Sequence, residues 1–166
     1  SAHVAMAPFD TEKPHGAEYA KAMLEIKLQT TDPSILFSDL DLTSLELFLR
    51  GETQSILRLY DHLLGGVKQI CVQYGEQRIS LGSDALQPVG FESQQQVLPY
   101  SARSFGGFQL LTEFFTFPER FHVIALDLAQ SLQYANTNEI KIQLFLDDMA
   151  VDLSRSLGAD NFHLFC

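Results

Sequence analysis

The sequence contains no tryptophan, only two cysteines and no long apolar run. A helix that crosses a membrane needs about 18 or more apolar residues in succession, so no membrane insertion is expected. Cys71 and Cys166 have no further cysteine or histidine at the spacing of a zinc site. Two cysteines are also too few for a small secreted disulfide scaffold. We therefore expect free thiols and a reducing, cytoplasmic compartment.

Positive charge is scarce as well. Lysine and arginine together number 11, whereas aspartate and glutamate number 21, which gives a formal net charge of −10 at pH 7. The phosphates of nucleic acid would be repelled by this charge, and no cluster of basic residues offsets it, so nucleic acid is not an expected partner. The acidic balance favours protein partners with basic surfaces.

The common catalytic and nucleotide-binding motifs are absent from the sequence. Two acidic pairs lack the ordered series of oxygen ligands that a hard metal ion requires, so we expect ordinary turn residues. These pairs are Asp39 with Asp41 and Asp147 with Asp148. His122 and His163 lie in strand-like segments and could face each other, but two histidines without a third ligand are weak support for zinc. No cofactor or metal site is predicted.

What the sequence does contain is thirteen phenylalanines within clear periodic patterns. Alternating or continuous apolar residues predict strands, and apolar residues at helical spacing predict two main helices, over 53–64 and 104–117. The predicted strands cover residues 22–29, 45–49, 67–74, 78–81, 121–126, 140–146 and 161–166. A short helix is expected over 150–157 and an irregular loop over 82–99. Strands grouped around the helices predict an α+β fold, a largely antiparallel sheet or sandwich.

The order of these segments predicts an extended arm over residues 1–18, followed by one α+β domain over 19–166. Pro8, Pro14 and Gly16 punctuate the arm, which shows no periodicity.

The second main helix carries the candidate site. Phe108, Leu111 and Phe115 form an apolar face that is predicted to pack on the strand over 121–126, and Pro118 ends the helix. Glu113 lies among these aromatic residues, where a carboxylate must be solvated or paired. The expected partner is Arg103 or Arg120, one at each end of the helix.

Two other readings of the sequence stay open at this point. Glu113 could be a general acid with a raised pKa, working with Asp127 or Asp147 in a carboxylate-dependent hydrolase. No nucleophile or second acid accompanies it in the same segment, which counts against this reading. A ligand-binding β-sandwich is the other alternative, and the absence of tryptophan counts against it.

Residues 98–121 read Leu-Pro-Tyr-Ser-Ala-Arg-Ser-Phe-Gly-Gly-Phe-Gln-Leu-Leu-Thr-Glu-Phe-Phe-Thr-Phe-Pro-Glu-Arg-Phe. This segment resembles the signature of the TssF (ImpG/VasA) family of type VI secretion baseplate subunits. Weaker similarities follow the family's order at residues 22–28, at 45–52 followed by 59–64, and at 159–166. Gly106-Gly107 departs from the family pattern, which has a bulkier residue beside a single glycine.

The resemblance implies a middle portion of a longer structural subunit of the baseplate wedge, cytoplasmic in bacteria and assembled at the inner face of the envelope. It implies TssG and TssK as partners, with TssE, the spike and a second copy of the subunit as further contacts. It supplies no catalytic residues, so no enzymatic activity is expected. The residues expected to be structural or to lie at an interface are Arg103, Phe108, Leu111, Glu113, Phe115, Pro118 and Phe121. Exposed apolar surface is expected over 4–9, 89–100 and 162–166, with the internal loop 89–100 as the contact with another subunit.

Overall fold

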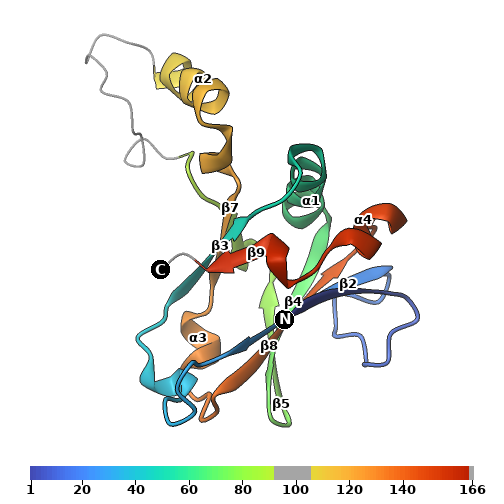
Figure 1. The fold of residues 1–166 in the computed structure, drawn as a ribbon. Helices are drawn as coiled ribbons and strands as arrows, with labels where there is room; N and C mark the ends of the chain where they lie inside the picture. Colours follow the sequence, from blue (N-terminus) through green and yellow to red (C-terminus); the bar gives the residue numbers. More distant parts are fainter. Residues whose placement is uncertain (92–105, 165–166) are drawn as a thin grey trace.

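The structure is a computed structural model that describes residues 1–91 and 106–164. Its core is formed by two antiparallel sheets (Figure 1). The five-stranded sheet has the order β1-β2-β8-β4-β5, and the four-stranded sheet has the order β6-β7-β3-β9. The predicted α+β class with a largely antiparallel sandwich is confirmed.

The strands of the five-stranded sheet are β1 (Ala2–Met6), β2 (Ala22–Gln29), β4 (Val67–Tyr74), β5 (Gln77–Gly82) and β8 (Glu139–Leu146). Those of the four-stranded sheet are β3 (Ser44–Leu49), β6 (Leu86–Pro88), β7 (Val123–Asp127) and β9 (Phe162–Leu164). The α-helices are α1 (Thr53–Gly66), α2 (Gly106–Thr116), α3 (Ala129–Leu132) and α4 (Val151–Ser156). Short 3₁₀ turns are η1 (Phe37–Asp39), η2 (Ser83–Ala85), η4 (Pro118–Phe121) and η5 (Ala159–Asn161).

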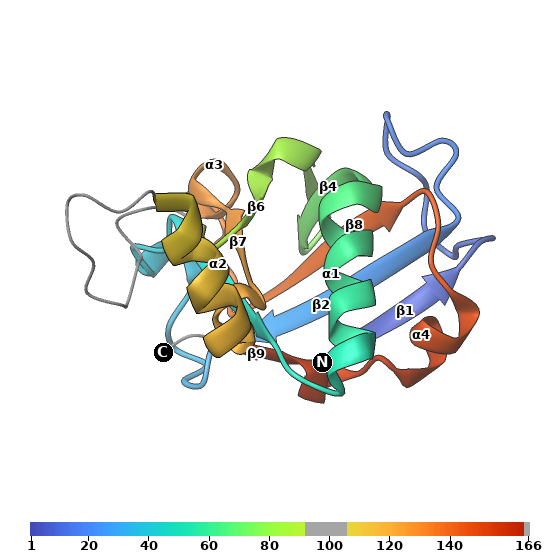
Figure 2. The same ribbon diagram turned by 90° about the horizontal axis from the view of Figure 1, so that it is seen from above.

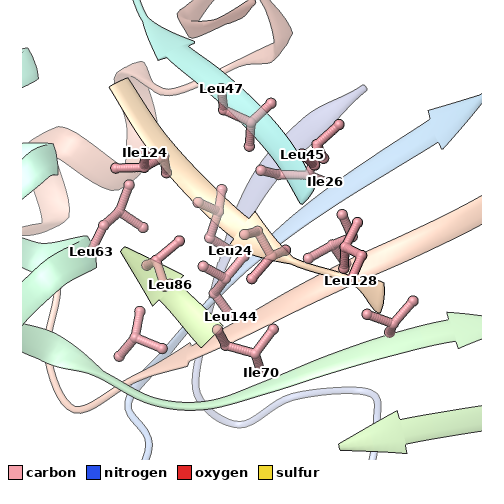
Figure 3. Packing of buried hydrophobic residues seen from close by; sticks show 14 of the residues in the cluster. Leu24, Ile26, Leu45, Leu47, Leu63, Ile70, Leu86, Ile124, Leu128 and Leu144 are labelled. Atoms are coloured by element: carbon pink, nitrogen blue, oxygen red, sulfur yellow. The ribbon is translucent and has the colours of Figure 1, made fainter. Parts of the chain in front are cut away.

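The main core lies between the two sheets (Figure 3). Side chains alternate between the two faces of a strand, so every second residue of each strand points into this core. In the four-stranded sheet, β3 contributes Leu45, Leu47 and Leu49, all of them buried. The opposite sheet contributes Leu24, Ile26, Ile70, Val72, Ile140, Ile142 and Leu144.

Helix α1 lies at one end of this core (Figures 1 and 2). Ile56, Leu59 and Leu63 recur at helical spacing and are fully buried, as the periodicity predicts. Leu57 points to the other side of the helix and is 43% exposed. The helix continues through Gly66 into β4 instead of ending at the first glycine of the pair.

The second face of the five-stranded sheet is covered by the N-terminal segment. Phe9 contacts Phe145 of β8 edge to face, with 5.8 Å between the ring centroids. Arg78 of β5 holds the same segment by donating a hydrogen bond to the carbonyl oxygen of Glu12, at 2.7 Å. The segment predicted as an arm therefore begins with the edge strand β1 and then packs on the sheet. The prediction of exposed apolar surface over 4–9 holds for Met6, Ala7 and Pro8, whereas Val4 and Phe9 are partly buried against the core clusters.

A smaller buried cluster forms beneath this covering segment. It includes Cys71 of β4, which is a free, fully buried thiol as predicted. Cys166 lies outside the described residues. Burial on both faces explains the apolar run over 144–146 at the end of β8. The neighbouring Gln143 is also buried, and it is hydrogen-bonded to both Arg78 and Glu25.

The region 82–99 is more ordered at its start than predicted. Leu86–Pro88 forms strand β6, which pairs with β7, and Leu86 is buried in the main core. Three residues are too few to produce a visible alternation, and proline within a run argues against a strand except at a sheet edge, where β6 lies.

Two leucines of α1 provide a matched test of this packing. Leu59→Ala should lower the free energy of unfolding by about 2–5 kcal/mol, because it opens a cavity in the core. Leu57→Ala, on the outer side of the same helix, should change it by less than about 0.5 kcal/mol. Urea denaturation of the purified chain followed by circular dichroism measures both, and equal effects would contradict the burial described above.

Candidate interaction site

Helix α2 stands out from the body of the molecule, beyond the start of β7 (Figure 1). It ends at Thr116, and Pro118 opens the 3₁₀ turn η4 that leads into the strand, as predicted from the sequence. A proline fits the first turn of a helix because its missing N–H would have no partner there. The orientation of α2 is therefore determined by a short connection and by the contacts that the helix makes with it.

The first of these contacts is an ion pair between Glu113 of α2 and Arg120 of η4. The side chain of Glu113 is fully buried, and that of Arg120 is 16% exposed. A buried carboxylate is costly unless a charge and hydrogen bonds compensate it, so the pair holds the helix against the turn. The predicted pairing with Arg120 is confirmed, whereas Arg103 lies outside the described residues.

The second contact is aromatic. Phe121, buried at the end of η4, lies between two other rings. Its ring centroid is 5.4 Å from that of Phe114 and 5.0 Å from that of Phe91. The guanidinium carbon of Arg120 lies 5.4 Å from the centroid of the same ring. Aromatic pairs at these distances add roughly 0.5–1.5 kcal/mol each to the burial of the rings.

The apolar face predicted to pack on the sheet points outward instead. Phe108, Leu111 and Phe115 are 66%, 54% and 79% exposed. Successive helical residues are rotated by about 100°, so these three lie on the side opposite Glu113, and Phe114 lies between the two sides, in contact with both Phe121 and Phe115. Periodicity predicts burial of the apolar side of α2, but the side that carries Glu113 faces the turn instead. The ion pair with Arg120 decides which side faces the turn.

A groove of about 400 Å³ lies on the outer face of the four-stranded sheet, beside η4. Its lining residues are Glu46, Phe48, Val89, Gly90, Glu119, Arg120 and Val123. Gly90 has a φ of +100°, and a Cβ atom there would lie 3.2 Å from the carbonyl oxygen of Arg120. A side chain at this position would thus be both strained and crowded.

The carboxylates proposed for a hydrolase are not brought together. Asp127 lies at the far end of β7 from α2, and its carboxylate accepts a hydrogen bond from the backbone N–H of Ala129. Asp147 forms a 2.9 Å salt bridge with Lys68, and hydrogen bonding to this lysine lowers the pKa of Asp147. Both residues thus have structural contacts of their own, away from Glu113.

The remaining polar candidates are also local contacts. Asp39 accepts a hydrogen bond from the backbone of Leu36, and Asp148 accepts one from Met149, as expected of turn residues. Burial lowers the pKa of His122, against a smaller opposing effect of Glu119, so the ring is neutral at pH 7. His163 contacts the carbonyl oxygen of Asp160. Within residues 1–91 and 106–164, no group of three or more metal-ligating side chains is found.

The structure describes only part of the apolar surface that is predicted at the loop and at the terminal strand. Only the start of the loop 89–100 is described. Its Val89 donates a backbone hydrogen bond to Val123, and Phe91 packs on Phe121. In the terminal strand, Phe162 packs against the main core and Leu164 is 50% exposed. The most exposed phenylalanines of the described chain belong to α2.

The chain is similar to known proteins in sequence and in fold. The family model "Type VI secretion system, TssF" matches residues 1–166. The chain is 29% identical over 150 residues to the type VI secretion system component TssF1 of Pseudomonas aeruginosa. That alignment covers 89% of this chain but only 24% of the relative, so the chain spans about a quarter of the length of this relative.

The fold is similar to that of a chain in the cryo-electron microscopy structure of the type VI secretion TssK-TssF-TssG baseplate subcomplex. The TM-score is 0.68 at 23% sequence identity, covering 86% of this chain and 27% of the other. The chain belongs to the TssF family of type VI secretion systems. No helix in the described part of the chain has the length and apolar character needed to span a membrane.

A double-mutant cycle tests the ion pair. Arg120→Met should lower the free energy of unfolding by about 3–5 kcal/mol, because Glu113 is then a buried charge without its cation. Adding Glu113→Gln should recover a large part of this loss. Urea denaturation of the single and double variants measures the coupling, and strictly additive losses would show that the two side chains do not act as a pair.

The two sides of α2 can be tested in the same way. Phe121→Ala removes the ring that contacts the inner side of the helix and should cost about 3–5 kcal/mol. Phe115→Ala, on the outer side, loses only its ring contact with Phe114 and should lower the free energy of unfolding by no more than about 1.5 kcal/mol. Thermal denaturation compares them directly. A large loss for Phe115→Ala would mean that this ring is buried after all.

Proposed function

We propose that this chain is part of a structural subunit of the type VI secretion baseplate that assembles with TssG and TssK. The match of the TssF family model to residues 1–166 carries this proposal. The similarity to a chain of the TssK-TssF-TssG subcomplex supports the choice of partners. TssE, the spike and a second copy of the subunit are further partners within the proposed assembly.

The outward side of α2 supports a role in assembly. The apolar side of a helix normally packs against a core, because water would otherwise contact its apolar side chains. Here Phe108, Leu111 and Phe115 together expose a contiguous apolar surface of the kind that marks interaction sites. We propose assembly in the bacterial cytoplasm at the inner face of the envelope.

The described contacts also support a structural rather than a catalytic role. The carboxylate of Glu113 is held by Arg120, and that of Asp147 is held by Lys68. A glycoside hydrolase that works with two carboxyl groups needs them about 5–9 Å apart, on either side of the scissile bond. The contact of Glu113 indicates a role in orienting α2, and that of Asp147 indicates a role in anchoring the end of β8.

Co-purification tests the proposed function. The full-length subunit that contains these residues should co-elute with TssG and TssK when the three proteins are co-expressed and one partner carries the affinity tag. Asp127→Asn should change neither assembly nor type VI secretion, because the asparagine oxygen can still accept the hydrogen bond from Ala129.

Two results would contradict the proposal. A folded full-length subunit that joins neither partner would remove the assembly role. Loss of secretion in Asp127→Asn, with co-elution unchanged, would indicate chemistry at this carboxylate instead.

A further inference from the structure

The groove beside η4 combines an apolar floor with an acidic rim. Strand β3 points Leu47 and Leu49 into the core, so Phe48 between them faces outward into the groove. Val123, at the start of β7, lies beside it, since Phe48 and Val123 are directly paired across the two strands. The ring of Phe48 is only partly buried, so this floor offers apolar contact to an incoming side chain.

The rim carries two exposed carboxylates, those of Glu46 and Glu119. In the part of the chain that the structure describes, neither carboxylate takes part in a salt bridge. Arg120 is the cation among the described lining residues, and its charge is compensated by Glu113. The groove therefore presents an excess of negative charge around an apolar centre.

We propose that this groove binds a segment of a partner protein in which an apolar side chain stands next to a lysine or arginine. The apolar side chain would rest on Phe48 and Val123, and the cation would pair with Glu46 or Glu119. The volume of about 400 Å³ is within the range of sites that hold a few side chains. The inference rests on the proposed function, because it places a partner of the assembly on this surface.

Charge complementarity selects this occupant over a second copy of the chain. Each copy carries a formal net charge of −10, so two copies brought together here would repel each other. A basic partner segment is attracted by the same charge, which raises the rate of association and makes it sensitive to salt. The contact of the partner's apolar side chain with Phe48 and Val123 then slows dissociation.

Charge reversal in the full-length subunit tests the acidic rim. Glu46→Lys combined with Glu119→Lys should weaken co-purification with the wedge partners by at least about tenfold, since like charges would face each other across the interface. The matched control is Asp10→Lys with Glu76→Lys, which makes the same change in formal charge at two exposed carboxylates outside the groove. The control should bind as the wild type does. An unchanged melting temperature in both variants shows that folding is preserved.

Photo-crosslinking identifies the occupant independently. A benzoylphenylalanine in place of Phe48, in the full-length subunit produced in its native bacterium, should capture a partner peptide whose sequence holds a lysine or arginine beside an apolar residue. The crosslink should be lost in the Glu46→Lys, Glu119→Lys background. The same probe at Leu57, exposed on α1, is the control for capture at an unrelated apolar position.

The two experiments separate the failures. Equal binding of the rim variant and its control, or capture of an acidic peptide, a second copy or the same chain, overturns the groove proposal while the assembly role stands. If the wild type does not join TssG and TssK, the assembly role falls. In that case a rim-dependent crosslink to a basic segment of another protein still supports the groove proposal. The absence of any crosslink overturns the groove proposal.

Discussion

The side chain of Glu113 is fully buried in a helix that stands out from the body of the molecule, and the position of this helix depends on its ion pair with Arg120. Once the carboxylate faces η4, Phe114 is brought onto Phe121, and Phe108, Leu111 and Phe115 must point away. One electrostatic requirement thus sets which aromatic rings stabilise the chain and which remain for contacts with other surfaces. The same arginine also forms part of the wall of the groove.

The sandwich gives this arrangement a rigid support. Strand β7 is paired on both sides, by β3 and β6, and its inward residues Ile124 and Leu126 belong to the main core. The turn η4 continues directly into this strand, so the ion pair and the aromatic cluster are built on one of the best-packed elements of the molecule. Groove and helix are consequently held by the same strand.

Much of the fold could be predicted from the sequence, because strands and helices bury one side and leave the other polar. Residues 22–29 alternate as a half-buried strand, and Ile56, Leu59 and Leu63 repeat at helical spacing. The pairing of Glu113 with an arginine at one end of the helix, Arg103 or Arg120, also followed from the cost of a lone carboxylate among phenylalanines. The orientation of α2 did not follow, because periodicity places the apolar side against the sheet, whereas the ion pair turns the side of Glu113 toward η4.

Other features carry weaker signals. The three-residue strand β6 is too short for a pattern, and the groove arises from residues of β3, η4 and the segment after β6, which are far apart in sequence. The covering of the second sheet face had one visible sign. Leu144, Phe145 and Leu146 form a continuous apolar run, which is typical of a strand buried on both sides. That sign does not say which segment provides the cover.

The order of strands in the five-stranded sheet has a consequence for synthesis on the ribosome. Strands β1 and β2 pair with each other early, but the other edge of β2 waits for β8, whose Gln143 is 118 residues from its partner Glu25. At about 5–20 residues per second, this edge stays open for roughly 5–25 s after β2 is made. An unpaired edge strand invites pairing with other chains. The nascent chain therefore passes through a period in which its first hairpin needs protection, before translation supplies the strand that closes the sheet.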